Sequence, residues 1–198
     1  MKRTQATVGI AFIGAMLFVV AVGVRAESAE TAPAERWAIK AFTPDGHTLD
    51  VKAITADGET LDVKAIPTHP HVLDVKAIDP SGALIAIKLL PPSDADGYYE
   101  VRAIPPSGEP LGIVARGPDG ERYPVEGFGG SGVVVDIKAV EPDGSRLAVK
   151  AISPDGIVFA VKGLDFSGEA GAADQPIEVH GVEYVGHVKA LPDLAARP

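Results

Sequence analysis

A hexad of alternating apolar and polar residues recurs about every twelve residues along most of this chain. Residues 49–66 read LDVKAITADGETLDVKAI, so the same hexad occurs twice, twelve residues apart. Thirteen hexads follow the pattern, and they begin at residues 37, 49, 61, 73, 85, 99, 111, 123, 135, 147, 159, 177 and 186. Self-similarity at a fixed period indicates a repeat architecture in which each unit is one supersecondary element.

Alternation with a period of two predicts that each hexad is a β-strand. Positions one, three and five of LDVKAI share one, aliphatic, face, whereas positions two, four and six share the other. No stretch shows a sustained helical stripe. We therefore expect an all-β domain of about 12–13 short strands over residues 37–191.

The residues between hexads predict hairpins. Pro-Asp-Gly or Pro-Ser-Gly stands at residues 44–46, 80–82, 118–120, 142–144 and 154–156. Proline presets φ at the first loop position, and glycine adopts the left-handed conformation that closes a three-residue loop with a bulge. Such loops join antiparallel neighbours, so the chain is expected to form an antiparallel β-meander from a 12-residue hairpin repeat.

Charged residues test this arrangement against a parallel β-solenoid, the alternative for a 12-residue period. A three-residue loop at residues 56–58 places Lys52 opposite Asp62 and Asp50 opposite Lys64. A solenoid would instead stack like charges, which is unfavourable, whereas each opposite pair contributes about 0.2–1 kcal/mol. The charge pattern therefore favours the meander.

The next hairpin is expected to extend this checkerboard of charges. Centred on His69, it would pair Asp62 with Lys76 and Lys64 with Asp74. Opposite charges would then alternate over one face of the sheet while the other face stays aliphatic.

Thirteen strands exceed what an open twisted sheet accommodates. A round barrel of this strand number would be too wide for Leu, Val and Ala to fill. We expect the sheet to fold over as a flattened barrel or sandwich; the alternative is an enclosed apolar cavity. Residues 124–133 are the expected hinge, because Pro124 interrupts a strand and four glycines follow Glu126.

The N-terminus predicts export. Lys2 and Arg3 precede an apolar run at residues 8–24, and a Val-Arg-Ala end predicts a signal peptide over residues 1–26, although a retained membrane anchor is the alternative. Residues 27–36 are expected to be a flexible spacer, and residues 192–198 a disordered tail. The protein is thus expected in the periplasm or outside the cell.

Composition excludes several function classes. Without residues 1–26 the chain has 15 basic and 27 acidic residues, which argues against nucleic acid as a partner. The chain contains no cysteine, so disulfides, thiolate metal sites and thiol catalysis are excluded.

Histidines near the C-terminus are one candidate metal site. His180 and His187 occupy outward positions of the last two hexads, beside Glu178, if these hexads pair as neighbouring strands. Two imidazoles and a carboxylate are ligands that suit Zn²⁺ or Cu²⁺. A solvated surface pair in a degenerate repeat is the alternative interpretation.

Three further histidines are a second candidate. Because turns alternate between the two ends of a meander, the loops centred on Asp45 and His69 are expected at the same end. His47, His69 and His71 would then approach one another and hold Zn²⁺ or Cu²⁺, or serve as ordinary polar turn residues.

Position six carries apolar residues on the otherwise charged face. These residues are Phe42, Ile54, Ile66, Ile78, Leu90, Ile104, Val140 and Ile152. They either cover the neighbouring turns or form an apolar row for a protein partner or a second copy. Exposed sheet edges are a further expected route to self-association.

The chain offers little support for catalysis. Its serines lie in turns or linkers, and strand aspartates that face lysines have lowered pKa values and make poor general acids. Near-identical units multiply a surface, so we expect a non-enzymatic exported scaffold for structure or protein interaction. A metal-binding protein and an apolar-ligand carrier are the alternatives.

Overall fold

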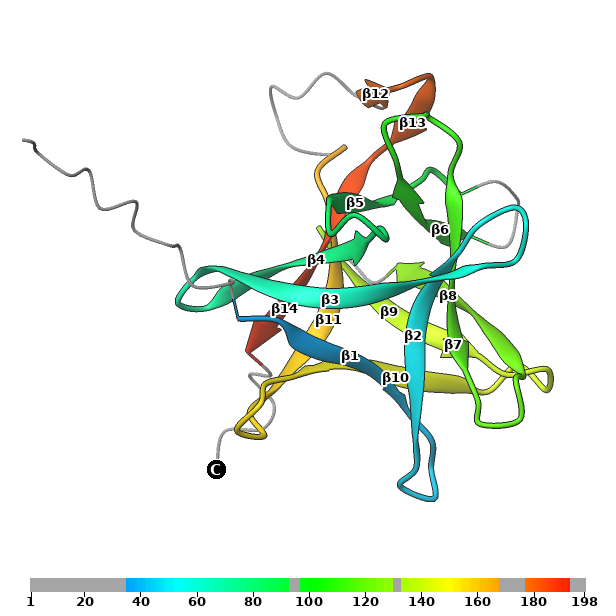
Figure 1. Ribbon diagram of the computed structural model, residues 1–198, viewed down its shortest axis with the longest axis vertical. Helices are drawn as coiled ribbons and strands as arrows, with labels where there is room; N and C mark the ends of the chain where they lie inside the picture. Colours follow the sequence, from blue (N-terminus) through cyan, green and yellow to red (C-terminus); the bar gives the residue numbers. More distant parts are fainter. Residues whose placement is uncertain (1–34, 93–96, 130–132, 168–176, 193–198) are drawn as a thin grey trace, which may run out of the picture. The chain divides into compact units, whose positions relative to one another are not determined.

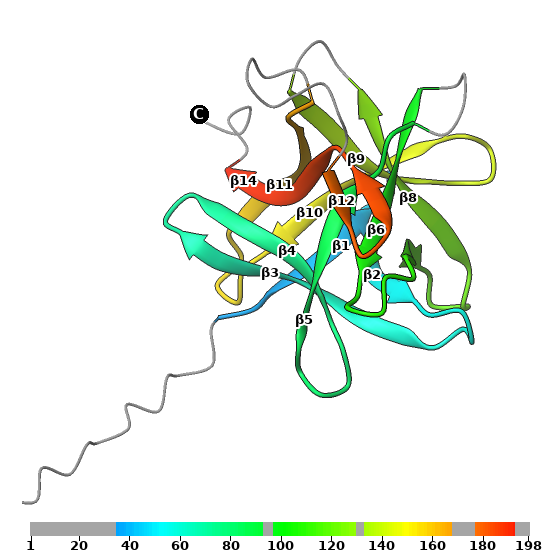
Figure 2. The same cartoon turned by 90° about the horizontal axis from the view of Figure 1, so that it is seen from above.

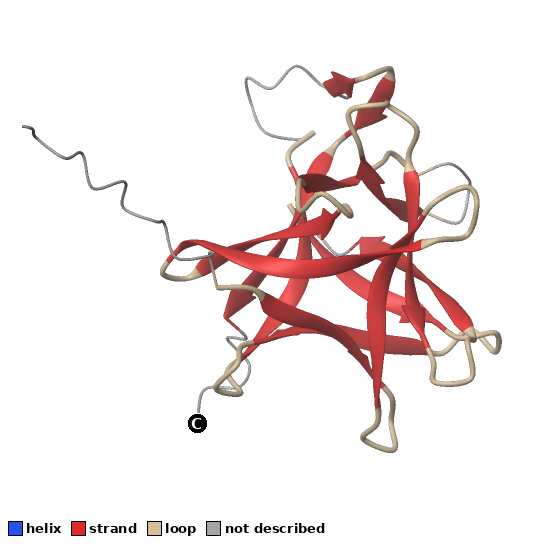
Figure 3. Cartoon of the chain, in the orientation of Figure 1, coloured by secondary structure: helices blue, strands red, loops and turns tan. Residues whose placement is uncertain are grey.

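The computed structural model describes residues 35–92, 97–129, 133–167 and 177–192. The regular elements in these residues are all β-strands (Figure 3), so the predicted all-β class is confirmed. They are β1 (Trp37–Phe42), β2 (Thr48–Ile54), β3 (Thr60–His69), β4 (Val72–Ile78), β5 (Leu84–Leu89), β6 (Tyr98–Ile104), β7 (Leu111–Arg116), β8 (Arg122–Gly129), β9 (Val134–Val140), β10 (Arg146–Ile152), β11 (Val158–Asp165), β12 (Ile177–Val179), β13 (Val182–Tyr184) and β14 (Gly186–Pro192). A search of the described residues finds no apolar helix of membrane-spanning length.

Twelve of these strands form one sheet, and β12 and β13 form a separate hairpin. Each strand from β1 to β10 pairs with the next strand along the chain, and β11 pairs with β14. All pairings are antiparallel, which confirms the meander and contradicts the solenoid.

Pairs between strands distant in sequence close the sheet into a ring. β1 pairs with β10, and β2 pairs with β7, each over five residue pairs; Figure 1 shows β1 beside β10. β14 returns to pair with both β4 and β5. The sheet therefore folds back on itself around one core, as its strand number requires.

The pairing pattern has a simple geometry. Mutually paired strands form four triplets, here named corners: β1–β2–β3, β4–β5–β14, β6–β7–β8 and β9–β10–β11. One further strand pair joins each two corners: β1–β10, β2–β7, β3–β4, β5–β6, β8–β9 and β11–β14. This is the connectivity of a tetrahedron, with triplets at its corners and strand pairs along its edges.

Each corner is cyclic. In the first corner, Ala41 of β1 lies opposite Leu49 of β2, the alanine at position five of β2 lies opposite Leu61 of β3, and Ala65 of β3 lies opposite Trp37 of β1. One edge of each strand thus pairs with both other strands of its corner. The opposite edge pairs with a single strand of another corner. Near-identical hexads suit this plan because every strand occupies an equivalent position.

The residues at position three meet in the centre of the ring. One side chain from each of the twelve strands lines a single cavity: Ile39, Val51, Val63, Val75, Ile87, Val101, Ile113, Val125, Ile137, Val149, Val161 and Val188. The cavity is only about 10 Å³, about one water-sized sphere. Burying each such side chain stabilises the fold by about 1.5–3 kcal/mol. The core of the ring, as formed by the described residues, is therefore too small for the ligand of an apolar-ligand carrier.

Position five shows how the corners stay tightly packed. Most strands carry a fully buried alanine there, but β5 carries Leu89, which is also fully buried. A Cβ added to Gly163 would lie 2.6 Å from Leu89 Cδ1, and one added to Gly186 would lie 3.0 Å from the same atom. Glycine in β11 and β14 therefore makes room for the larger side chain of β5.

The hairpin loops have the predicted form. In the β1–β2 loop, Gly46 has φ +87° and its N–H donates to the Thr43 carbonyl, while the Thr43 N–H donates to the His47 carbonyl. The same two hydrogen bonds recur in the loops that begin at residues 55, 79, 117, 141 and 153. The three-residue loops with left-handed glycine are confirmed.

The predicted register holds only near such loops. Lys52 lies opposite Asp62 as expected, but Asp50 does not lie opposite Lys64. Instead, Asp50 lies between Lys40 of β1 and Arg116 of β7. The prediction failed because β2 leaves β3 after three residue pairs and exchanges partners.

The checkerboard is wrong along β3 and β4. Lys64 lies opposite Lys76, and Asp62 lies opposite Ile78. The loop lacks a glycine for the left-handed position, so β3 continues through a bulge to His69, and only Pro70 and His71 form the turn. This longer strand shifts the register by two residues.

Several expected segments differ from the structure or lie outside it. The expected hinge overlaps β8, which runs through Pro124 to Gly129; residues 130–132 are outside the described residues. The predicted signal peptide (1–26), most of the spacer and residues 193–198 are outside as well. The hexad at residue 177 is not one strand, because it turns at His180 and Gly181 into hairpin β12–β13.

Candidate functional site

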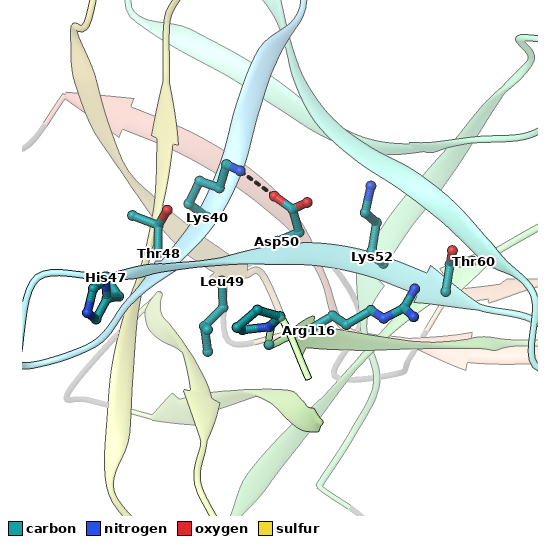
Figure 4. Close-up of a pocket in the computed structure, with 10 residues that line it drawn as sticks. Lys40, His47, Thr48, Leu49, Asp50, Lys52, Thr60 and Arg116 are labelled. Carbon is teal, nitrogen blue, oxygen red and sulfur yellow. Dashed lines mark hydrogen bonds and ion pairs between the residues drawn. The ribbon is translucent and has the colours of Figure 1, made fainter. Parts of the chain in front are cut away.

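A cleft of about 670 Å³ opens over β2, beside β1 and the turn that follows β7. Ten residues line it: Lys40, His47, Thr48, Leu49, Asp50, Lys52, Thr60, Arg116, Gly117 and Pro118. Figure 4 shows eight of them labelled, with Arg116 extending along β2. Its volume falls within the range of about 300–1,000 Å³ that small-molecule sites occupy. We name it the β2 cleft.

The cleft forms because side chains alternate between the two faces of β2 and because β2 changes its pairing partner at the corner. Asp50 and Lys52 occupy outward positions of β2, between strands that diverge on either side. Lys40 of β1 pairs with Asp50, and Lys52 pairs with Asp62 of β3 at 2.5 Å. The strands β1, β2 and β7 thus contribute charges to one concave surface.

The cleft contains three cations, two of which are paired. Lys40, Lys52 and Arg116 line it, but Lys40 pairs with Asp50 and Lys52 with Asp62, which lies outside the lining. Arg116 is exposed and forms no ion pair within the described residues. A guanidinium presents a planar fork of donors that matches carboxylate and phosphate groups, so Arg116 is the most available anion-binding group of the cleft.

Asp50 stays ionised in this setting. The hydrogen bond from Lys40 and the nearby lysine charges hold the pKa of the Asp50 carboxyl below its ordinary value. An ionised, half-exposed carboxylate neutralises one lysine and is a poor proton donor near neutral pH. The arrangement suits electrostatic binding of an anion.

A different cluster lies at the β4–β5–β14 corner. Lys88 of β5 is buried, with 7% exposure, and its Nζ lies 2.8 Å from His187 Nδ1 of β14. Nζ also lies 4.1 Å from the centroid of the buried Tyr184 ring. The Phe166 ring packs against both Tyr184 and His187. We name Lys88, His187, Tyr184 and Phe166 the lysine cluster.

Burial and like charges shift both titrating groups of the lysine cluster toward their neutral forms. Desolvation, followed by Lys76 and Lys189, lowers the pKa of Lys88 to about 8. Desolvation, followed by Lys88, lowers the pKa of His187 to about 4. At neutral pH, His187 is an uncharged imidazole and can accept a hydrogen bond from Lys88.

The strand pairing expected to bring His180, His187 and Glu178 together is not the one found, because β12 pairs with β13. His187 lies on β14 as expected, but His180 lies in the two-residue turn of hairpin β12–β13, with φ +52°. Its backbone packs against the loop after β6, where a Cβ added to Gly108 would lie 2.5 Å from the His180 carbonyl oxygen; Figure 2 gives a second view of this hairpin. Glu178 is exposed on β12.

The second group of histidines is divided between the β1–β2 turn and the end of β3 with its following turn. His47 lies in the β1–β2 turn, with Nε2 3.5 Å from Asp45 Oδ2, while His69 ends β3 and His71 lies in the following turn. Across the described part of the chain, no group of three or more His, Asp or Glu side chains has a geometry that could hold a metal ion.

The expected interaction surfaces also take another form. Three residues of the position-six row, Ile66, Ile78 and Ile104, are buried, and the other five are half-buried. The twelve ring strands use both edges within the described residues, so β12 and β13 are the strands with an unshared edge. The row is therefore partly covered within the fold, and its role toward a partner stays a prediction.

Sequence reasoning missed Arg116 and Lys88. Arg116 belongs to the degenerate hexad LGIVAR, and its approach to Asp50 depends on the pairing of β2 with β7, which no local pattern predicts. A signal for Lys88 was present: GHVKAL has histidine at position two, where the hexads at residues 49, 61, 73 and 135 carry an aspartate that faces a lysine. Finding it required knowledge that β5 and β14 share a corner.

Comparison with known proteins agrees with the extent of the ring. No curated protein and no solved structure matches the chain. A family model described as a family of unknown function (DUF7486) matches residues 35–191, which run from just before β1 into β14. The chain therefore belongs to this family of unknown function, DUF7486.

Proposed function

We propose that the protein is an exported, non-enzymatic scaffold domain that holds an acidic segment of a protein partner in the β2 cleft. The observation that carries the proposal is the grouping of Lys40, Lys52 and Arg116 in one concave surface. The whole chain has a formal net charge of −9, so an arginine without an ion pair in a cleft with two lysines is a local exception to its charge. Local charge complementarity steers and orients a partner.

The fold suits a scaffold because the residues that form the core differ from those that form the surface. Positions three and five lie in the core in every ring strand, and position one lies in the core or packs against it, while positions two, four and six carry the differences between corners. A partner segment can therefore be recognised by outward residues without disturbing the framework. Asp50, whose pKa is held low by Lys40, supports binding more than proton transfer.

Export is proposed from the N-terminal sequence. The basic pair Lys2–Arg3, the apolar run at residues 8–24 and the small-residue end at Ala26 form a signal-peptide pattern. A cysteine-free domain that packs one continuous core has no need of disulfides in an oxidising compartment.

Calorimetric titration with a hexaglutamate peptide tests the binding site. We expect saturable binding at low salt that weakens at high salt. Arg116→Ala should lower the affinity about tenfold, because a hydrogen bond to a charged group contributes about 1.5–3 kcal/mol.

Lys138→Ala is the matched control, because Lys138 is an outward cation of β9, in another corner. It should leave the affinity unchanged. Equal losses in both variants, or no binding to the wild-type protein, would refute the β2 cleft as the site.

A further inference from the structure

In the corners, nine lysines at position four lie opposite position two of the next strand, and four of these lysines face alanine. The other five contacts have a polar partner. Four of them are ion pairs with aspartate: Lys40–Asp50, Lys52–Asp62, Lys162–Asp136 and Lys189–Asp74. The fifth is Lys88–His187, in which histidine stands in the place of the aspartate. The four lysine–aspartate pairs therefore serve as an internal reference for the Lys88–His187 contact.

The fifth contact leaves an amine without a counter-ion. Lys88 forms no ion pair within the described residues, and its Nζ is enclosed by His187 and the Tyr184 ring. The paired lysines in the equivalent contacts have side-chain exposures of 23–30%, whereas Lys88 is 7% exposed as a residue. In the same corner, Lys76 and Lys189 share a single carboxylate, that of Asp74.

This setting makes Lys88 more nucleophilic than an ordinary lysine. Only a neutral amine has the lone pair needed for attack, and desolvation next to other cations favours that form. With a pKa of about 8 in place of 10.5, the neutral fraction near pH 7.4 rises by roughly 200-fold.

We propose that Lys88 is a carbon dioxide-binding site, at which the amine forms a carbamate. The lone pair of the neutral Nζ attacks the carbon of CO₂, an N–C bond forms, and one C=O electron pair moves to oxygen. The nitrogen then loses one proton to solvent, so R–NH₂ and CO₂ give R–NH–COO⁻ and H⁺.

The smallest carbonyl electrophile suits a side chain with so little exposed surface. The product also fits the corner: its carboxylate adds the second negative charge that Lys76 and Lys189 otherwise lack beside Asp74. The neutral His187 ring, held by Phe166 and Tyr184, has a second nitrogen available as a hydrogen-bond donor to that carboxylate. This inference is independent of the β2 cleft.

Incubation of the full chain with ¹³C-bicarbonate tests the site. A carbamate resonance in the ¹³C spectrum, and its fixation as an ethyl ester by triethyloxonium followed by peptide mass spectrometry, should locate the adduct on Lys88. Its amount should rise with a midpoint near pH 8 rather than near the ordinary lysine pKa. Lys88→Arg should abolish the adduct.

Two substitutions of His187 distinguish an effect on the reactivity of Lys88 from an effect on side-chain packing. H187D rebuilds the ordinary lysine–aspartate contact of the other corners, so it should raise the Lys88 pKa and lower the adduct at least tenfold. H187N keeps a neutral acceptor and should retain the adduct within about twofold. The absence of a Lys88 adduct in the wild-type protein, or an equal amount in folded H187D, would overturn the proposal.

Should H187D fail to fold, the pH profile of the wild-type protein decides. A midpoint at the ordinary lysine pKa would also overturn the proposal, whereas a midpoint near pH 8 together with retention in H187N would support it.

Discussion

Leu89 of β5 lies directly against Gly163 of β11, although 74 residues separate them in sequence and most other hexads place alanine at this position. Both strands border β14. The pair conserves volume: a larger side chain on one strand is matched by the absence of a side chain on the other. The pair shows how side chains of two corners pack against each other.

Gly163→Ala is therefore expected to destabilise the fold by about 1–3 kcal/mol, the usual cost of overpacking. The added Cβ would lie 2.6 Å from Leu89 Cδ1 and 3.1 Å from Val135 Cβ. Leu89→Ala alone should cost about 2–5 kcal/mol through the cavity it leaves. Urea unfolding of both variants measures these values.

The double variant tests the coupling. Gly163→Ala with Leu89→Ala restores the alanines of the other hexads, so the two changes should be less harmful together than their separate effects predict, by about 0.5–3 kcal/mol. Strict additivity would show that the two residues are not in contact.

His187 predicts how stability depends on pH. Its pKa is about 4 in the folded protein against an ordinary 6.5, so the unfolded chain binds more protons between these values. Stability should therefore fall as the pH decreases from 6.5 to 4. Strand aspartates such as Asp50 and Asp136 have lowered pKa values, so their contribution is lost only at lower pH.

His187→Asn removes the imidazole and should flatten the stability profile between pH 4 and 6.5. His47→Asn, at the exposed β1–β2 turn, is the matched control and should leave the profile unchanged. A wild-type slope that survives in His187→Asn would assign the effect to another group.

Gly58 tests the conformation of the repeated loops. It has φ +87°, and a Cβ added to it would meet nothing within 4 Å, so any cost of Gly58→Ala comes from the backbone alone. We expect a loss of about 1–3 kcal/mol, with a smaller loss for Gly58→Asn, because asparagine tolerates the left-handed region better. Thermal unfolding would reveal the order, and an alanine variant as stable as the wild type would contradict it.

Expression in a bacterium with its own export system tests the N-terminal interpretation. The mature protein is expected to begin at Glu27, since cleavage after Ala26 fits the small-residue rule. Mass spectrometry of the purified chain measures this directly. A chain that retains residues 1–26 in the membrane fraction would favour the anchor instead.

Local features of the fold were predictable because they depend on neighbouring residues. The alternation in LDVKAI identifies the buried face, and the glycine after Pro44-Asp45 sets the loop. The pairing of Lys52 with Asp62 follows from that loop alone. These local rules predict the structure within a single hairpin.

Long-range pairing could not be predicted for a physical reason. Near-identical hexads present the same edges and the same aliphatic face, so no pattern distinguishes β10 or β7 as partners of β1 or β2. The burial of Lys88 depends on Tyr184, which is placed by a hairpin that interrupts the repeat. The candidate sites arise where the repeats diverge and where distant strands meet, and both conditions are invisible locally.

The closed ring is the central claim, and the pairing of β1 with β10 tests it most directly. Lys40 lies opposite Lys150 across this pair, and Cα atoms opposite one another in antiparallel strands lie about 4.5–5.5 Å apart, within disulfide range. In this cysteine-free chain, the variant with Lys40→Cys and Lys150→Cys should form an intramolecular disulfide on mild oxidation. A folded variant that does not form this cross-link would contradict the ring, provided that the control variant with Lys40→Cys and Asp50→Cys does form one. Only the local meander would then remain.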